Sequence, residues 1–451
     1  MKRWILVSLI CVGLAGPAFP QEGMEERVGD LEAENADLRN DLEALRRELS
    51  ELSGRRGVGG QLDGPAPSGT GTTILDINKR ETERLGTKGG LFSKPFLADL
   101  ANRTYVGGYI DLEYRDEQGE RRTFRQHRFI PFIYSQVTDQ IRVAAEIEFE
   151  DGGTDAPRGD GETKVEFATL DYQPWEAFGI RAGAILIPLG KFNLIHDSPV
   201  NDLTDRPLVS QFVIPSTLND AGVGIFGTFY PTEESVLNYE LYATNGFVGL
   251  EADATSATGF TSNFNTTSGV RGGRPSLKED NNNSISGVGR ISVSPRLGTE
   301  VGVSAFTGAY DDKGDNNLLI YALDVVHSIT AALEFQGEIA RAEIERDTLA
   351  RTSGVPKDLW GFYSQLNYHF MPEYLEERWP IVFGEDSIFT AVARLGHVEL
   401  GSVRTQRVTA GLNFRPIEGT VFKIDYQFNF EDWSRGRVDN DAFLFSIASY
   451  F

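Results

Sequence analysis

The sequence predicts an all-β protein, a sixteen-stranded antiparallel transmembrane β-barrel preceded by a short α-helical coiled coil. Three observations predict it. The chain begins with the pattern of an export signal, a heptad repeat follows, and from residue 104 onward apolar and polar residues alternate with period two. Alternation at this period is typical of strands that have one apolar and one polar face.

Composition and charge exclude several classes of function. The 451 residues include 43 basic and 66 acidic ones, giving a formal charge of -23, whereas a nucleic-acid partner needs a basic surface. Nucleic acid is therefore excluded as a partner. Cys11 is the sole cysteine and lies in the export signal, so the mature chain is predicted to lack disulfides, catalytic thiols and thiolate metal sites.

Residues 1–20 have the layout of a cleaved secretory signal peptide. Lys2 and Arg3 precede an apolar run from Trp4 to Leu14, and small residues follow from Ala15 to Ala18. A single membrane helix is the alternative, but the run is far shorter than the roughly 20 apolar residues that such a helix needs. Export leaves three destinations: the periplasm, the medium, or the outer membrane of a Gram-negative cell.

Residues 21–53 are predicted to form a periplasmic coiled coil. Its seam alternates steps of four and three through Met24, Val28, Leu31, Asn35, Leu38, Leu42, Leu45, Leu49 and Leu52. Opposite charges at successive g and e positions, such as Arg27 with Glu32, favour parallel helices. The number of helices in the coiled coil stays open, because Asn35 favours a dimer whereas leucine at both seam positions is compatible with several oligomeric states. A solitary amphipathic helix is the alternative.

Residues 54–103 are predicted to be a linker and a poorly defined periplasmic segment. Gly, Pro and small polar residues dominate from Ser53 to Thr73, and such a composition cannot bury a core. Residues 74–103 have no clear period, so no element is predicted there.

Residues 104–451 are predicted to form the barrel. In the clearest strand, Phe422, Ile424 and Tyr426 alternate with Lys423 and Asp425. Sixteen such runs occur: Tyr105 to Arg115, Phe124 to Ser135, Gln140 to Glu150, Lys164 to Pro174, Phe178 to Ile187, Gly222 to Tyr230, Val236 to Asn245, Ile285 to Ser294, Thr299 to Gly308, Leu318 to His327, Thr330 to Glu343, Leu359 to Phe370, Ser387 to Val398, Arg407 to Arg415, Val421 to Phe430, and Ala442 to Phe451. Most are near the ~9–11 residues that a tilted strand needs to cross a bilayer.

The connections between these runs alternate between short and long. Those after even-numbered strands are mostly tight, such as Pro416 to Thr420, whereas those after odd-numbered strands include Pro188 to Ala221 and Gly246 to Ser284. Short periplasmic turns opposite long outer loops are typical of outer-membrane barrels. Met371 to Asp386 is the exception. An even strand count places both barrel ends in the periplasm with the coiled coil.

The stretch from Ile180 to Gly227, which reads IRAGAILIPLGKFNLIHDSPVNDLTDRPLVSQFVIPSTLNDAGVGIFG, resembles the signature region of the phosphate-selective porin O/P superfamily and its relatives. The segments His127 to Gly152 and Gly411 to Phe430 support the resemblance, and a last strand ending in Phe451 resembles the recognition signal of outer-membrane barrels. The resemblance implies a homotrimeric diffusion channel in outer-membrane lipid. The superfamily's phosphate-binding arginines and lysines do not match position by position, so phosphate specificity is not implied.

Residues 188–221 follow the fifth strand and resemble the constriction loop that general porins fold into the lumen. The charged residues of this loop are Lys191, His196, Asp197, Asp202, Asp205, Arg206 and Asp220. A solvated surface loop is the alternative.

If the apolar faces meet lipid, the opposite faces place both signs of charge in the lumen. The basic candidates are Arg125, Arg142, Arg181, Arg290, Arg394, Arg407 and Lys423, and the acidic ones are Glu146, Glu148, Glu240, Glu334, Glu338 and Asp425. Basic wall residues opposite loop carboxylates would favour polar solutes in general, whereas rings of like charge would select ions. Arg125, Arg142 and Arg181 predict a local basic stripe, with structural pairing to Glu146, Glu148 or Glu166 as the alternative.

The sequence thus predicts an outer-membrane channel for passive diffusion of small polar or charged solutes, anions among them. No GxSxG nucleophile elbow or GxxxxGK[ST] phosphate loop occurs, and the five histidines are scattered, so no enzyme activity, cofactor or metal site is predicted. Two alternatives stay open: a structural barrel that ties the outer membrane to peptidoglycan through the coiled coil, and a soluble secreted β protein.

Overall fold

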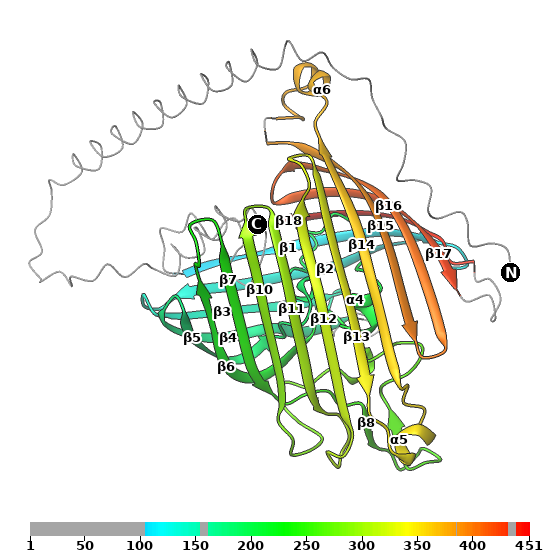
Figure 1. The fold of residues 1–451 in the computed structure, drawn as a ribbon. Coiled ribbons are helices and arrows are strands. Elements are labelled where there is room, and N and C mark those ends of the chain that lie inside the picture. Colours follow the sequence, from blue (N-terminus) through cyan, green and yellow to red (C-terminus); the bar gives the residue numbers. More distant parts are fainter. Residues whose placement is uncertain (1–103, 154–160, 385, 432–438) are drawn as a thin grey trace, which may run out of the picture. The chain divides into compact units, whose positions relative to one another are not determined.

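The computed structural model describes residues 104–451 except 154–160, 385 and 432–438. The predicted signal peptide, coiled coil and linker lie outside the described residues. Sixteen antiparallel strands formed by the described residues close into one barrel (Figure 1). No helix among these residues has the length and apolar character needed to cross a membrane.

The barrel strands are β1 (Thr104–Glu117), β2 (Thr123–Gln136), β3 (Ile141–Glu150), β4 (Glu162–Trp175), β5 (Phe178–Leu186), β6 (Asn219–Phe229), β7 (Val236–Thr244), β10 (Ser286–Arg296), β11 (Thr299–Ala309), β12 (Asn317–Ser328), β13 (Leu333–Ile344), β14 (Asp358–Phe370), β15 (Ile388–Leu400), β16 (Val403–Ile417), β17 (Thr420–Glu431) and β18 (Ala442–Tyr450). Each strand overlaps one alternating run of the sequence, so the predicted sixteen-stranded antiparallel barrel is confirmed. The connection between β7 and β10 holds a separate sheet of β8 (Leu250–Ala252) and β9 (Phe260–Ser262).

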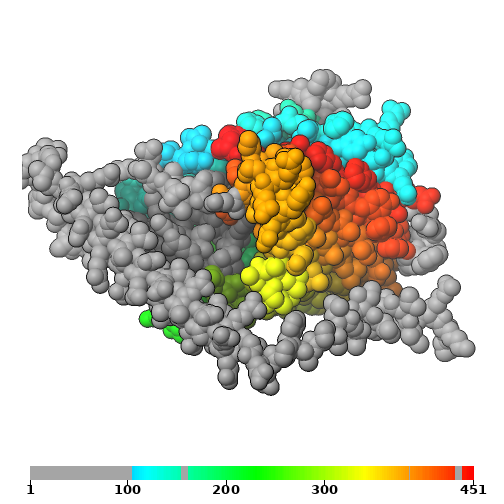
Figure 2. Space-filling model, turned by 90° about the horizontal axis from the view of Figure 1, so that it is seen from above, coloured from blue at the N-terminus to red at the C-terminus, as the bar shows by residue number. Residues whose placement is uncertain are grey.

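The first and last strands close the barrel. β1 pairs with β2 on one side and with β18 on the other, with Tyr109 opposite Tyr450. In Figure 2 the cyan start of the barrel and its red end accordingly lie side by side. Closure leaves no row of unpaired backbone groups at a sheet edge, which is the condition for a sheet to lie in hydrocarbon.

The polarity of the two barrel faces is inverted relative to a soluble protein. In β17 the side chains of Lys423 and Asp425 are both 1% exposed, whereas Ile424 between them is 48% exposed. Every barrel strand contributes an exposed large apolar side chain to the outer face: Ile110, Ile133, Ile147, Leu170, Ile180, Val223, Leu241, Ile291, Val303, Leu323, Ile339, Leu366, Leu395, Leu412, Ile424 and Phe443. We call this set the apolar belt.

Aromatic side chains gather near the strand ends. Tyr368, Phe370, Phe389, Phe414 and Phe422 form a continuous ladder of ring contacts across β14 to β17. At the opposite strand ends the ring of Tyr114 contacts those of Phe124 and Phe443. Aromatic girdles that flank an apolar band are a property of membrane barrels, because these rings favour the membrane–water interface.

The two ends of the barrel differ in their connections. One end has tight turns, such as 297–298 and 418–419, and one longer segment that contains α6 (Glu373–Arg378). The other end has the longest connections, 187–218 and 245–285, as well as α5 (Thr348–Thr352) between β13 and β14. In Figure 1, α6 marks the short-turn end and α5 the long-loop end.

Part of the barrel interior is apolar. The inner wall residues Val288, Phe306 and Ile320 pack against Ile214 and Phe264 of the two long connections in one buried cluster. The sequence predicted a uniformly polar inner face, so this apolar part of the interior was not expected. The physical reason is that the connections fold inward, so wall residues that face them are shielded from water, and each buried side chain contributes about 1.5–3 kcal/mol.

Candidate channel interior

The segment 187–218, between β5 and β6, lies inside the barrel. It contains two short helices, α3 (Lys191–Leu194) and α4 (Val209–Phe212). Its polar side chains and backbone contact inward-facing residues of β1, β4, β11, β13, β14, β15, β16, β17 and β18. We call this segment the inner loop.

Two aspartates attach the middle of the inner loop to the wall. Asp205 receives two hydrogen bonds from Arg115 of β1, at 2.8 and 3.1 Å, and lies 3.4 Å from Nη1 of Arg407. Burial raises the pKa of Asp205, but Arg115 outweighs this and holds the pKa below its ordinary value. Asp202 accepts a hydrogen bond of 3.1 Å from Nη2 of Arg415 on β16. Both loop carboxylates are therefore neutralised by direct contact with wall cations.

His196 and Asp197 attach the first half of the inner loop. The Nε2 of His196 lies 3.4 Å from both carboxylate oxygens of Glu166 on β4. Burial lowers the pKa of His196, but Glu166 outweighs this effect and the pKa lies above its ordinary value. Asp197 accepts a hydrogen bond of 2.6 Å from the hydroxyl of Tyr450 on β18.

The two ends of the inner loop have their own contacts. Nζ of Lys191 lies 2.8 Å from Glu300 on β11, and Glu338 on β13 accepts a hydrogen bond of 3.1 Å from the backbone N–H of Phe192. Nη1 of Arg206 donates to the carbonyl of Ser216 within the loop itself. Asp220 is the second residue of β6 and accepts a hydrogen bond of 2.7 Å from the N–H of Gly246 in the next long connection.

Two of the three arginines of the predicted stripe come together, and both are ion-paired. Arg142 of β3 and Arg181 of β5 share Asp171 of β4, with Arg142 at 3.1 Å and Arg181 at 2.8 and 2.9 Å. Arg290 forms a two-fold contact with Asp324 at 2.5 and 2.7 Å. Bidentate pairs of this kind fix the guanidinium plane and neutralise its charge.

The structure separates Arg125 from the other two arginines. Arg125 lies near the start of β2, opposite Glu113 of β1 in the strand register. Arg142 of β3 lies opposite Gln136, at the other end of β2. Arg125 contacts Glu150 and Asp151 on its own side of the barrel. The carboxylate of Glu146 accepts a 2.6 Å hydrogen bond from Tyr134, and Glu148 lies 2.9 Å from Arg128. The wall thus consists of local charge pairs.

Arg394 differs from the other arginines predicted for the wall. Its Nε donates to Gln365 and its Nη1 to the carbonyl of Asp205, each at 2.7 Å, and its guanidinium lies 5.7 Å from the ring centroid of Tyr363. Among the described residues, no carboxylate lies within ion-pair distance of Arg394. The contacts of this buried cation are therefore to neutral groups.

Arg394 lines a cavity of about 370 Å³ toward the short-turn end, with Lys191, Asp202, Glu334 and Arg415 among its other walls. A wider cavity of about 520 Å³ toward the long-loop end is lined by Glu162, Lys164, Arg271 and Arg274. Burial and the neighbouring Arg274 lower the pKa of Arg271. Within the described part of the chain, neither arginine has a carboxylate at ion-pair distance.

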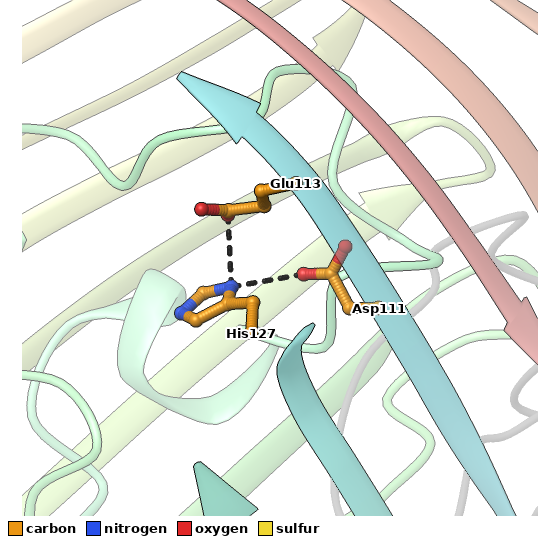
Figure 3. A group of neighbouring side chains, drawn as sticks. All are labelled: Asp111, Glu113 and His127. Carbon is orange, nitrogen blue, oxygen red and sulfur yellow. Dashed lines mark hydrogen bonds and ion pairs between the residues drawn. The ribbon is translucent and has the colours of Figure 1, made fainter. Parts of the chain in front are cut away.

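Sequence reasoning missed several residues that organise this interior. Asp171 and Asp324 occupy polar positions in the alternation of their strands, so the pattern could have predicted that both face the interior. The wall cations Arg115 and Arg415 lie at the ends of predicted runs, where the direction of a side chain is not fixed by periodicity. Asp111, Glu113 and His127 form a further group that no spacing rule indicated (Figure 3).

Comparisons with known proteins give distant similarities. No protein-family model matches the sequence. An uncharacterized protein of Aquifex aeolicus (strain VF5) is 26% identical over 385 residues, spanning 79% of this chain and 84% of that protein.

Solved structures with similar folds include three outer-membrane proteins. The outer-membrane channel DcaP of Acinetobacter baumannii is 10% identical with a TM-score of 0.48, over 77% of this chain and 97% of that one. OmpF of Salmonella typhi in complex with daunomycin is 9% identical with a TM-score of 0.49, over the same shares. The anion-selective porin from Comamonas acidovorans is 11% identical with a TM-score of 0.46, over 77% and 99%. No family assignment follows from these similarities.

Proposed function

We propose that this protein is an outer-membrane porin that lets small polar or charged solutes diffuse through its lumen. The observation that carries the proposal is the inverted polarity of a closed barrel: the apolar belt runs through every strand, while Lys423, Asp425 and their counterparts are buried inside. Half-burial of sixteen such belt residues in lipid contributes on the order of 10 kcal/mol or more. Water offers no comparable stabilisation of that surface.

The interior supports passage of hydrated solutes rather than a chemical reaction. Most wall charges are paired, so the lumen is polar without a strong net field, which suits diffusion of many polar solutes. Arg271 and Arg274, which have no carboxylate partner among the described residues, give the larger cavity a positive bias. In the smaller cavity the charge of Arg394 is offset by Glu334, whose hydrogen bonds in the described part of the chain are to amides. We infer a preference for anions over cations from this bias.

Single-channel recording in planar bilayers tests the proposal. The purified full-length protein should produce discrete conductance steps, and the reversal potential in a salt gradient should show anion preference. Arg394→Gln should shift permeability toward cations. Arg341→Gln removes the same charge from the exposed outer face and serves as the matched control.

Two results would contradict the proposal. Absence of conductance in a correctly folded, membrane-inserted protein would refute the channel. An unchanged reversal potential in Arg394→Gln would refute the assignment of selectivity to that residue, while leaving the channel itself intact.

The buried apolar cluster favours one second candidate, a structural barrel that ties the outer membrane to peptidoglycan through residues 21–53. Ile214, Phe264 and Phe306 fill part of the lumen with packed side chains, which narrows the space for solutes. A barrel that conducts no ions but sediments with peptidoglycan, and ceases to do so when residues 21–53 are deleted, would establish this candidate instead.

We further propose that three chains assemble in the membrane, with the coiled coil in the periplasm. The heptad seam of residues 24–52 supplies a self-associating element. Unheated samples in detergent should migrate on gels as trimers and boiled samples as monomers. Migration as a monomer under both conditions would contradict the assembly.

A further inference from the structure

Two carboxylates and one imidazole converge on the inner face of the barrel. Asp111 and Glu113 lie two residues apart on β1 and so share its inner face, and His127 lies opposite them on β2 (Figure 3). Nδ1 of His127 is 3.0 Å from Oδ2 of Asp111 and 2.8 Å from Oε1 of Glu113. Asp111 is 2% and Glu113 1% exposed. The three ligand atoms lie within 4.8 Å of one another.

A β-bulge places His127 in this group. Asp111 pairs with Arg128 and Leu112 with Gln126, so His127 is an extra residue without a partner on β1. The bulge lets both His127 and Arg128 face the interior, which strict alternation would forbid. Bulges that redirect a side chain occur preferentially next to functional sites. The three residues lie on two strands, so no motif spacing in the sequence indicated the group.

Hydrogen bonds within the protein do not satisfy the two buried carboxylates. A single hydrogen on Nδ1 cannot donate fully to both Asp111 and Glu113, although both lie within reach of it. Among the described residues, Oδ1 of Asp111 has no hydrogen-bond donor, and Oε1 of Glu113 has no donor other than the shared Nδ1 of His127. Ser198 donates to the other oxygen of Asp111, and Arg115 to the other oxygen of Glu113. A buried acceptor without a donor costs about 1–3 kcal/mol.

We propose that Asp111, Glu113 and His127 bind a divalent first-row transition-metal ion such as Mn²⁺, Co²⁺ or Zn²⁺. With metal–ligand bonds of about 2.1 Å, adjacent ligands of an octahedron lie about 3 Å apart, which matches the two Nδ1–oxygen distances. Two carboxylates balance the charge of the ion, and one imidazole ligand favours a transition metal over Ca²⁺ or Mg²⁺, which prefer oxygen ligands.

The carboxylate of Glu150 contacts the second ring nitrogen of His127. Nε2 of His127 lies 3.3 Å from Oε1 of Glu150. Metal-binding histidines typically donate their second N–H to such a group, which fixes the ring orientation and makes the other nitrogen a better ligand. Glu150 is therefore a positioning residue for the site. Three protein ligands leave further coordination positions to water or to a solute.

Cobalt binding to the full-length protein in detergent tests this site independently of any channel activity. Metal-stripped protein is titrated with Co²⁺, its visible absorption is followed, and bound metal is counted by elemental analysis. We expect one Co²⁺ per chain, binding at least about tenfold weaker in His127→Gln and Asp111→Asn, and about 10–100-fold weaker in Glu150→Gln.

His327→Gln is the matched control, because His327 lies on β12 next to Thr299 and far from β1 in the strand order. It should bind Co²⁺ like the unmodified protein. Asp111→Asn preserves side-chain size, and an intact heat-dependent gel shift confirms that each variant is folded. Failure of the unmodified protein to bind Co²⁺, or equal binding by folded His127→Gln, would overturn the assignment.

Discussion

Replacing Asp205 with asparagine should loosen the inner loop without unfolding the barrel. The carboxylate of Asp205 accepts hydrogen bonds from two nitrogens of Arg115, at 2.8 and 3.1 Å, and from Gln427 at 2.9 Å, and lies 3.4 Å from Arg407. Asparagine keeps the size of the side chain but removes its charge. Glu113, at 3.3 Å, then remains as the carboxylate partner of Arg115 among the described residues.

The expected magnitude follows from this geometry. Removing one partner of a fully buried ion pair costs about 3–5 kcal/mol. The side chains of Arg115 and Asp205 are 25% and 16% exposed, so water partly compensates the lost contact. We therefore expect the seated inner loop to lose roughly 2–4 kcal/mol of stability relative to a released loop. This raises the population of the released loop about 30- to 1,000-fold.

Single-channel recording measures the consequence. Asp205→Asn should increase the mean conductance and its fluctuations, because the released loop no longer narrows the lumen. Asp315→Asn, an exposed position between β11 and β12, is the control and should leave conductance unchanged. Conductance and noise that match the unmodified protein in folded Asp205→Asn would refute the reasoning that this ion pair holds the loop.

Three further predictions concern the apolar belt, His196 of the inner loop, and Asp171, which Arg142 and Arg181 share. Leu241→Arg on the outer face should lower the free energy of unfolding in lipid vesicles by about 2–4 kcal/mol, and a loss near zero would contradict lipid contact there. Burial and Arg128 lower the pKa of His196, but Glu166 and Asp197 outweigh them and raise it. The charged imidazole therefore stabilises the seated inner loop fully below pH about 6.5, and this stabilisation is lost as the pH rises through the raised pKa. Conductance should therefore rise at alkaline pH, and a pH dependence that persists in His196→Gln would argue against this. Asp171→Asn removes the carboxylate that Arg142 and Arg181 share, while Arg181 keeps its 3.5 Å contact with Glu240, and it should shift the reversal potential toward anions; an unchanged reversal potential would show that neither arginine reaches the permeation path.

The sequence predicted the barrel because its signal is repeated in every strand. In β17, for example, Phe422 and Ile424 alternate with Lys423 and Asp425, and the same pattern recurs in all sixteen strands. Each strand exposes apolar side chains on its outer face, so local periodicity separates the residues of the two faces. Alternation places Ile424 and Lys423 on opposite faces of the sheet, whereas the number of strands and the alternation of short and long connections predicted that the face of Ile424 points outward.

Details of the interior were less predictable because they depend on irregularities and on distant contacts. The bulge at His127 adds a residue to β2, and a second one at Glu166 on β4, where Ile147 pairs with Val165 and Glu146 with Phe167, turns Phe167 inward next to Glu166. Neither bulge leaves a mark in the composition of its strand. Likewise, Phe306 faces inward as an apolar residue only because a connection folded from elsewhere in the chain covers it.

The inner loop has two kinds of attachment, and they should respond differently to conditions. On one side Ile214 and Val209 belong to the buried apolar cluster, whose stability scarcely depends on salt. On the other side Asp205 and Asp202 are attached to Arg115 and Arg415 by ion pairs, and the pair of Asp202 and Arg415 lines the smaller cavity. Added salt screens partly exposed ion pairs but leaves apolar packing intact. Movement of the loop is therefore expected to begin at its aspartates, with the apolar side as the fixed end, and so to widen the lumen next to β1, β16 and β17.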